Sequence, residues 1–167
     1  MLVGEPDSMT AANIDPSSRY LATGGDRQNS IHIWDLDSGR LLGTCNGNVS
    51  LDGIVWSPDG LTLASVGYLG LKLWSTRFHT ELANLEPRSG FIPCGFTADG
   101  RTLVSLARHA DLKFWHVPTL RELMTLEVPD AASHLQFSPD GSALAVTLGG
   151  DYNRTVKLLR APVPTPR

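Results

Sequence analysis

Cysteine is scarce in this chain, and long apolar runs are missing. The 167 residues contain two cysteines, Cys45 and Cys94, far apart in the sequence. Two thiols are too few for the disulfide framework of a small secreted domain, so we interpret both as small apolar residues within strands. No segment approaches the roughly 20 apolar residues of a membrane-spanning helix, and residues 1–9 lack the charged and apolar regions of a signal peptide. We therefore expect a soluble, cytoplasmic chain without a membrane partner.

Basic charge is sparse too. The chain has 14 Lys and Arg against 17 Asp and Glu, a net charge of −3, and no block of one sign. Nucleic-acid binding depends on clustered positive charge that neutralises phosphates, and this composition does not supply it. The sequence therefore predicts no nucleic-acid partner.

Recognisable catalytic motifs are absent as well. The sequence has no Gly-x-Ser-x-Gly elbow, no phosphate-binding loop ending in Gly-Lys-Ser/Thr and no His-Glu-x-x-His pair. His109, Asp111 and His116 are the single His/Asp cluster, and they lack a convincing fourth ligand for a metal ion. We expect a chain that is not an enzyme, with no catalytic residues, no cofactor and no metal.

A turn followed by a strand is present four times. In the clearest copy, Trp56-Ser57-Pro58-Asp59-Gly60 precedes Leu71-Lys72-Leu73-Trp74. Pro presets φ at the second corner and Gly accepts the positive φ before the next strand, so this segment predicts a hairpin corner. The other copies are residues 14–18 with 31–34, 96–100 with 112–115 and 137–141 with 156–159, and Ser18 stands where the others have Gly. The strands end at 34, 74, 115 and 159, so the repeats are 40, 41 and 44 residues long, which indicates a repeat architecture.

Each unit predicts four short strands, a to d, from its alternation of apolar and polar residues and its Gly, Pro and Asp breaks. The units span about 9–45, 51–85, 91–126 and 132–159, and together with the first residues they form one domain at 1–160. The last unit lacks strand d, and Met1-Leu2-Val3 falls where such a strand would finish, so we expect it to close the last unit. Prolines at every second position of 161–167 predict an extended tail.

The corner, the apolar-Lys-apolar-Trp strand and the Trp34-Asp35 pair resemble the WD40 family of β-propellers. The resemblance implies an all-β fold of about four WD40-like, four-stranded antiparallel blades, forming a partial propeller or half of a larger ring. The chain departs from the family because it has no Gly-His pair, and because Gln28, Tyr68, His109 and Asn153 stand where an Asp is usual. What remains is a Ser or Thr positioned to accept from the strand-c indole: Thr23 for Trp34, Ser65 for Trp74 and Ser105 for Trp115. The last unit has the apolar pair Val146 and Leu159 instead.

Three lysines, Lys72, Lys113 and Lys157, share one position in strand c, where His32 stands in the first unit. A basic stripe is one interpretation. We favour a structural one, in which each stem covers apolar strand surface and each ammonium group remains in water.

Only the b–c connections vary in length, with seven residues at 24–30, five at 66–70, six at 106–111 and nine at 147–155. Variable loops on a rigid scaffold are where binding contacts concentrate, and Tyr and Arg are frequent in such contacts. The candidate protein-binding residues are Asp26, Arg27, Tyr68, Arg108, His109, Asp151, Tyr152, Asn153 and Arg154. Together with the resemblance, these residues predict a protein-interaction scaffold of unidentified partners. The alternative is a TolB-like or peptidase-associated propeller that serves an enzyme or transport complex.

An open arc of four blades would leave one apolar face bare at each end. We expect either a homodimer that completes an eight-bladed ring or a longer parent protein that holds the remaining blades. A small closed ring of four blades is a third arrangement.

Overall fold

The computed structural model describes residues 9–25, 30–47, 50–86, 92–106, 111–128, 132–138, 142–149 and 154–160. Regular structure in these residues consists of β-strands and one 3₁₀ turn, which confirms the all-β prediction. The segments expected to form a closing strand (Met1–Val3) and a tail (161–167) lie outside the described residues.

Blades 1 and 2 are four-stranded antiparallel sheets whose strands pair in chain order. Blade 1 consists of β1 (Met9–Ile14), β2 (Tyr20–Gly25), β3 (Ser30–Asp35) and β4 (Leu41–Asn46). Blade 2 consists of β5 (Leu51–Trp56), β6 (Thr62–Gly67), β7 (Gly70–Ser75) and β8 (Thr80–Glu86).

Blade 3 repeats this order with β9 (Ile92–Phe96), β10 (Thr102–Leu106), β11 (Leu112–His116) and β12 (Arg121–Leu126). A 3₁₀ turn (Val117–Thr119) that the pattern did not predict connects its last two strands, with Pro118 in its first turn and Leu120 in the left-handed region after it. Blade 4 has three strands among the described residues: β13 (Ala132–Phe137), β14 (Ala143–Leu148) and β15 (Thr155–Arg160).

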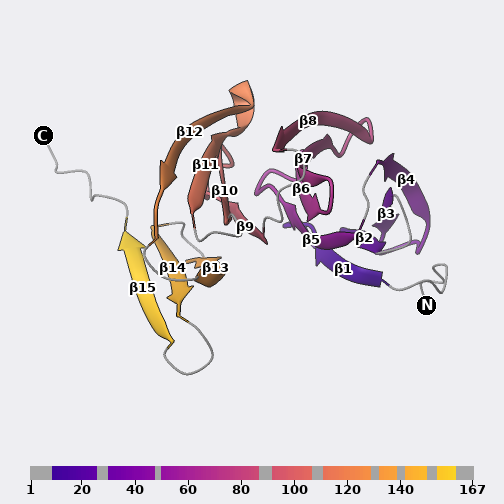
Figure 1. The fold of residues 1–167 in the computed structure, drawn as a ribbon. Helices are drawn as coiled ribbons and strands as arrows, with labels where there is room; N and C mark the ends of the chain where they lie inside the picture. Colours follow the sequence, from indigo (N-terminus) through magenta and orange to yellow (C-terminus); the bar gives the residue numbers. More distant parts are fainter. Residues whose placement is uncertain are drawn as a thin grey trace, which may run out of the picture.

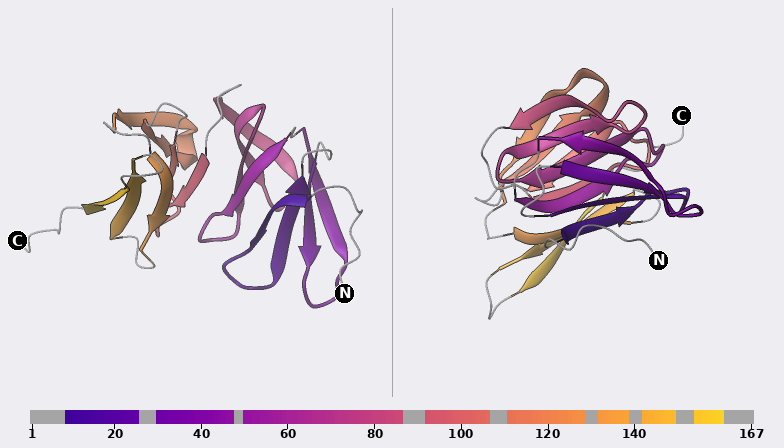
Figure 2. Two further views of the ribbon diagram at one scale, coloured as in Figure 1. Left: turned by 60° about the horizontal axis from the view of Figure 1, so that its bottom comes forward. Right: turned by 90° about the vertical axis from the view of Figure 1, so that its right-hand side faces the viewer.

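The four sheets fan out into an open arc, with blade 1 and blade 4 at its two ends (Figure 1). The first strand of each blade is innermost, because β1 contacts β5, β5 contacts β9 and β9 contacts β13. The views in Figure 2 show the same fan of twisted sheets from two other directions. The described strands therefore do not form a closed ring of four blades.

The corners of blades 1, 2 and 3 are present as predicted and share one backbone hydrogen-bond pattern, whereas residues 139–141 of the fourth corner lie outside the described residues. In blade 2 the N–H of Gly60 donates to the carbonyl of Ser57 (2.9 Å), and the Ser57 hydroxyl accepts from the N–H of Thr62 (2.9 Å). Gly60 has a φ of 70° and Gly100 a φ of 67°. Ser18 has a φ of 60°, so the first corner is built in the same way with a residue less suited to this region.

The remaining half of the family's polar network is formed as expected. The indole N–H groups of Trp74 and Trp115 donate to the hydroxyls of Ser65 and Ser105 at 2.8 Å, both within the core. Trp34 makes the same bond to Thr23 at 2.9 Å. In blade 4 the corresponding Val146 is buried in an apolar cluster that Leu159 also contacts. The predicted apolar variant is therefore confirmed.

The expectation of water-exposed ammonium groups is wrong for blade 2. The Lys72 side chain is only 9% exposed, and its Nζ lies 2.7 Å from a carboxylate oxygen of Glu81 and 5.5 Å from the centre of the Trp74 ring. Lys113 repeats the arrangement less tightly, with Glu122 at 3.5 Å. The reason is a bulge between Leu73 and Trp74, which places Glu81 of β8 opposite the tryptophan and beside the lysine.

Candidate functional site

The b–c ends of the blades form the face on which the sequence predicts partner binding. Tyr68 lies at the tip of the turn between β6 and β7 and is 68% exposed. The strands that carry it are almost entirely buried, and its own N–H donates to the carbonyl of Ser50 (3.1 Å), in the connection that enters β5. An exposed aromatic ring is thus held on a well-anchored hairpin.

Arg154 is the other predicted site residue that the structure describes, exposed directly before β15 in blade 4. Blade 3 stands between it and Tyr68, so these two side chains belong to separate parts of the face. The remaining predicted residues lie outside the described residues: Asp26, Arg27, Arg108, His109, Asp151, Tyr152 and Asn153.

The opposite end of the blades, which we call the a–b face, holds the a–b corners and the c–d turns. In three blades the residue after strand c donates to a carbonyl of the a–b corner: Leu36 to Arg19 (2.8 Å), Thr76 to Leu61 (3.1 Å) and Val117 to Arg101 (2.9 Å). Each pair of neighbouring turns is therefore tied together, which makes this end of each blade a firm support.

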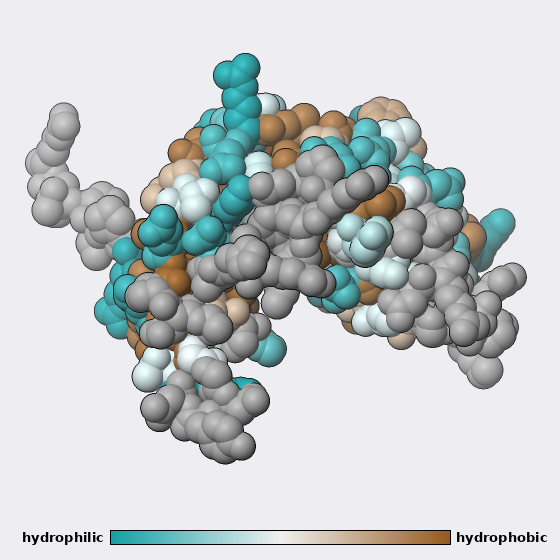
Figure 3. All heavy atoms as spheres, viewed as in Figure 1, coloured by the Kyte–Doolittle hydropathy of each residue, from teal (hydrophilic) through white to brown (hydrophobic). Residues whose placement is uncertain are grey.

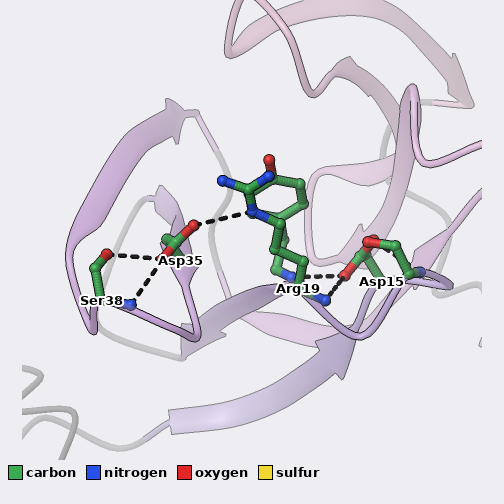
Figure 4. A network of polar contacts seen from close by, with 6 residues as sticks. Asp15, Arg19, Asp35 and Ser38 are labelled. Carbon is green, nitrogen blue, oxygen red and sulfur yellow. Dashed lines mark hydrogen bonds and ion pairs between the residues drawn. The ribbon is translucent and has the colours of Figure 1, made fainter.

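In blade 1 a polar network strengthens this tie (Figure 4). Asp15 accepts from the backbone N–H groups of Arg19 (2.8 Å) and Tyr20 (2.6 Å), while the Arg19 Nε lies 3.3 Å from Asp35. Asp35 also accepts from the backbone N–H (2.8 Å) and hydroxyl (2.7 Å) of Ser38. These bonds from Ser38, together with Arg19, hold the pKa of Asp35 below its ordinary value.

The pKa of Asp15 is also lowered, although two effects oppose each other there. Burial raises the pKa, because it disfavours the charged form, but hydrogen bonds from Ser17, Tyr20 and Arg19 outweigh it. Asp15 and Asp35 are therefore firmly ionised groups that support the turns.

A pocket of about 490 Å³ opens on the a–b face where blade 1 meets blade 2. Its apolar lining includes Tyr20, Ile33 and Trp56, and Arg77 and His79 are among its polar lining residues. Sequence reasoning did not find it, because the lining residues come from strands and from connections of constant length, in elements that are far apart in the sequence.

The approach of the two blades beside the pocket depends on a glycine. A Cβ added at Gly43 of β4 would lie 2.2 Å from ring atoms of His79, so the imidazole rests directly on the blade 1 backbone. His79 is itself held in the left-handed region, with a φ of 55°. The signal for this contact is a single Gly in a strand, which the sequence pattern does not distinguish from an ordinary weak strand position.

Among the described residues, no group of three or more His, Cys, Asp or Glu side chains is arranged to hold a metal ion. Cys45 is buried in the core between blades 1 and 2, and this burial raises the pKa of its thiol to about 11. The interpretation of Cys45 as an apolar strand residue is confirmed, while the Cys94 side chain is outside the described set. In the part of the chain that the structure describes, no helix is long and apolar enough to cross a membrane.

Four-stranded antiparallel sheets fanned about an inner set of strands are the blades of a β-propeller. Residues 2–35 match the family model described as "WD domain, G-beta repeat", up to the Trp34-Asp35 pair. Residues 2–35 are therefore a match to one WD40-type repeat, and the other three units repeat its corner and strand-c positions in a degenerate form. Proteins of this family are generally interaction scaffolds without catalytic activity.

Two relatives match nearly all of this chain, but this chain covers only part of each of them. "Nuclear distribution protein PAC1" of the fungus Arthroderma otae is 31% identical over 96% of this chain and 37% of its own length. "Protein FIZZY-RELATED 1" of Arabidopsis thaliana is 24% identical over 96% of this chain and 35% of its own. This chain thus spans about a third of each of these relatives.

Two solved structures likewise cover nearly all of this chain, while this chain covers only part of each of them. The structure titled "Structure of U3-55K" is 23% identical with a TM-score of 0.81, covering 96% of this chain and 51% of that one. A hydrazine synthase of Kuenenia stuttgartiensis aligns with a TM-score of 0.80 at 15% identity, over 94% of this chain and 47% of that one. At these identities the likeness shows the fold alone. The chain corresponds to about half of each solved chain.

Proposed function

We propose that this chain is a rigid platform that binds partner proteins through its b–c face. The observation that carries the proposal is the exposure of Tyr68, 68%, at the tip of a hairpin whose strands are buried. A partner that covers Tyr68 gains a large amphipathic surface, and little conformational entropy is lost because the hairpin is already ordered.

Two further features favour the b–c face. The connections there are the ones that differ in length between repeats, so each blade can present a different surface on the same framework. Arg154 adds a cation at the same end of blade 4, and Arg and Tyr are among the residues most enriched in binding hot spots. The predicted binding residues that lie outside the described part of the chain belong to the same proposal: Asp26, Arg27, Arg108, His109, Asp151, Tyr152 and Asn153.

The pocket on the a–b face makes that face the competing surface. The aromatic residues of its lining could contact an apolar side chain of a partner, and Arg77 could bind an anionic group beside that side chain. Arg77 forms no ion pair with any described carboxylate, but its guanidinium lies 5.3 Å from the centre of the neighbouring Phe78 ring. An experiment must therefore compare the two faces directly.

Blade 2 offers a matched pair of variants for this comparison. Tyr68 on the b–c face and Phe78 on the a–b face are 68% and 67% exposed, and both lie in turns of the same sheet. Tyr68→Ala and Phe78→Ala remove similar rings from opposite ends of one blade. Because both rings are mainly in water, both variants should keep the circular dichroism spectrum and unfolding midpoint of the parent chain.

We expect proteins captured from lysate by the immobilised parent chain to bind Tyr68→Ala more weakly by about 30-fold or more, the loss typical of a hot-spot tyrosine. Phe78→Ala should retain them. Quantitative mass spectrometry of the captured fractions, followed by titration of the main partner, measures both losses. Loss of binding in Phe78→Ala alone would assign the function to the a–b pocket, and equal loss in both variants would refute the choice of face.

A further inference from the structure

Every joint between neighbouring blades pairs the same two sheet faces. In the first joint, Trp56, Leu63 and Trp74 of blade 2 share one core cluster with Ile31 and Ile33 of blade 1. We call the face with the strand-c Trp position the front face of a blade and the opposite face its back face. The joint between blades 2 and 3 is the same, with a front face of Phe96, Leu103 and Trp115 on a back face of Ala64, Val66, Leu71 and Leu73.

Blade 1 has a front face that no described blade covers. Ile14 pairs with Leu21 and Leu21 pairs with Trp34 across β1, β2 and β3, so the three side chains lie on one face. Ile14 is 54% exposed, while its equivalents Trp56 and Phe96 are each 6% exposed beneath the preceding blade. Trp34 is only half-buried, although it forms the same bond to a hydroxyl as the covered tryptophans.

The back face of blade 4 is not covered by any of the described blades. Leu158 and Val156 of β15 are 57% and 65% exposed, and hydrophobic side chains reach the surface over this end of the arc (Figure 3). The equivalent residues of blade 2, Leu73 and Leu71, are 0% exposed because blade 3 covers them. Opposite them on β14 lie Ala145 and Thr147, at the positions that Ala64 and Val66 hold in the back face of blade 2.

We infer that the back face of blade 4 binds the front face of blade 1 of a second copy of this chain. The joints within the chain already show that these two kinds of face are complementary, and the described blades leave one face of each kind uncovered. Ile14, Leu158 and Val156 are 54%, 57% and 65% exposed, and removing such apolar surface from water favours association. This pairing is independent of the b–c face proposed above to bind partners.

The contact is head to tail, and two copies suffice to close it. The chain covers 51% and 52% of two solved propeller chains on which it superimposes with TM-scores of 0.81 and 0.80. If each chain forms about half of a propeller ring, two chains together form a complete ring. The two joints between the chains are then identical and are related by a twofold axis. Closure removes every exposed end face, so assembly should stop at the dimer.

Light scattering and sedimentation of the purified 167-residue chain test the inference. We expect a mass near twice 18.1 kDa, about 36 kDa. Leu158→Glu and Ile14→Glu each place a carboxylate in both joints, so each should weaken association by about 100-fold or more and give an 18.1 kDa monomer. Leu123→Glu is the matched control, because Leu123 is also 57% exposed but lies on β12, at the outer edge of blade 3. It should remain dimeric.

Mixing the two monomeric variants distinguishes a joint between a front face and a back face from a joint between two like faces. The intact front face of Leu158→Glu can bind the intact back face of Ile14→Glu, so the equimolar mixture should recover a heterodimer through one joint. Circular dichroism checks that each variant is folded, as expected for substitutions at exposed positions. Three results would each overturn the inference: a parent chain that is not a dimer, a loss of association in Leu123→Glu equal to that in the other variants, or a mixture that stays monomeric. A monomeric parent chain would indicate that blades of another chain segment cover these faces.

Discussion

Ser18 is the residue at which the corner geometry makes its sharpest prediction. Its φ of 60° matches those of Gly60 (70°) and Gly100 (67°), and its side chain is exposed and makes no hydrogen bond to a described residue. Replacing it with Gly therefore changes backbone preference and nothing else in the folded state. Ser18→Gly should stabilise the chain.

The magnitude follows from two opposing effects. A non-glycine residue in the left-handed region costs about 1–2 kcal/mol, while Gly costs about 0.5–1 kcal/mol more conformational entropy on folding. The free energy of unfolding should therefore rise by about 0.5–1 kcal/mol. For a chain of 150–250 residues this corresponds to about 1–4 °C in the unfolding midpoint.

The reciprocal variant is Gly60→Ser, which makes the second corner like the first. A Cβ at Gly60 meets nothing within 4 Å, so no clash contributes, and this change should destabilise by about the amount that Ser18→Gly stabilises. Denaturant unfolding of the three proteins at one concentration measures both differences. Equal stability of Ser18→Gly and the parent, beside a destabilised Gly60→Ser, would show that the first corner does not bear the strain that its φ implies.

Two further predictions concern buried polar groups. Ser65→Ala leaves the Trp74 indole N–H without its 2.8 Å acceptor in the core and should cost about 1–3 kcal/mol in denaturant unfolding, whereas Thr125→Val, which removes an exposed bond to Glu122, should cost less than about 0.5 kcal/mol. Similar losses in both would argue that the indole finds another acceptor. Because the pKa of Asp15 is lowered by folding, its stabilising effect is complete above the unfolded pKa of about 4 and is lost as pH falls through the folded value. The difference in unfolding free energy between the parent and Asp15→Asn should therefore shrink from pH 6 to pH 3, and a constant difference would contradict the assigned role of the carboxylate.

Features made within one hairpin could be predicted from the sequence. The corner needs Ser, Asp and Gly within five positions, and the hydrogen bond between Trp74 and Ser65 joins strands that one short turn connects. The register of such a hairpin follows from the alternation of apolar residues, because a shift of one position would expose the whole core face. Three predicted features are local in this sense: the four-stranded blade, the replacement of the Ser–Trp pair by Val146 and Leu159 in the last unit, and the positive φ of Ser18.

Features made between elements were decided by tertiary structure. The pairing of Lys72 with Glu81 depends on a bulge at Trp74 that alternation does not encode. The a–b pocket depends on how closely blade 2 approaches blade 1, which the bare backbone at Gly43 permits. The exposure of Ile14 and Leu158 depends on which blade has a neighbour, since the same positions are covered in the interior blades. The repeat pattern predicts which side chains each blade can bury. Which of these side chains remain exposed to a partner depends on whether that blade has a neighbour in the arc.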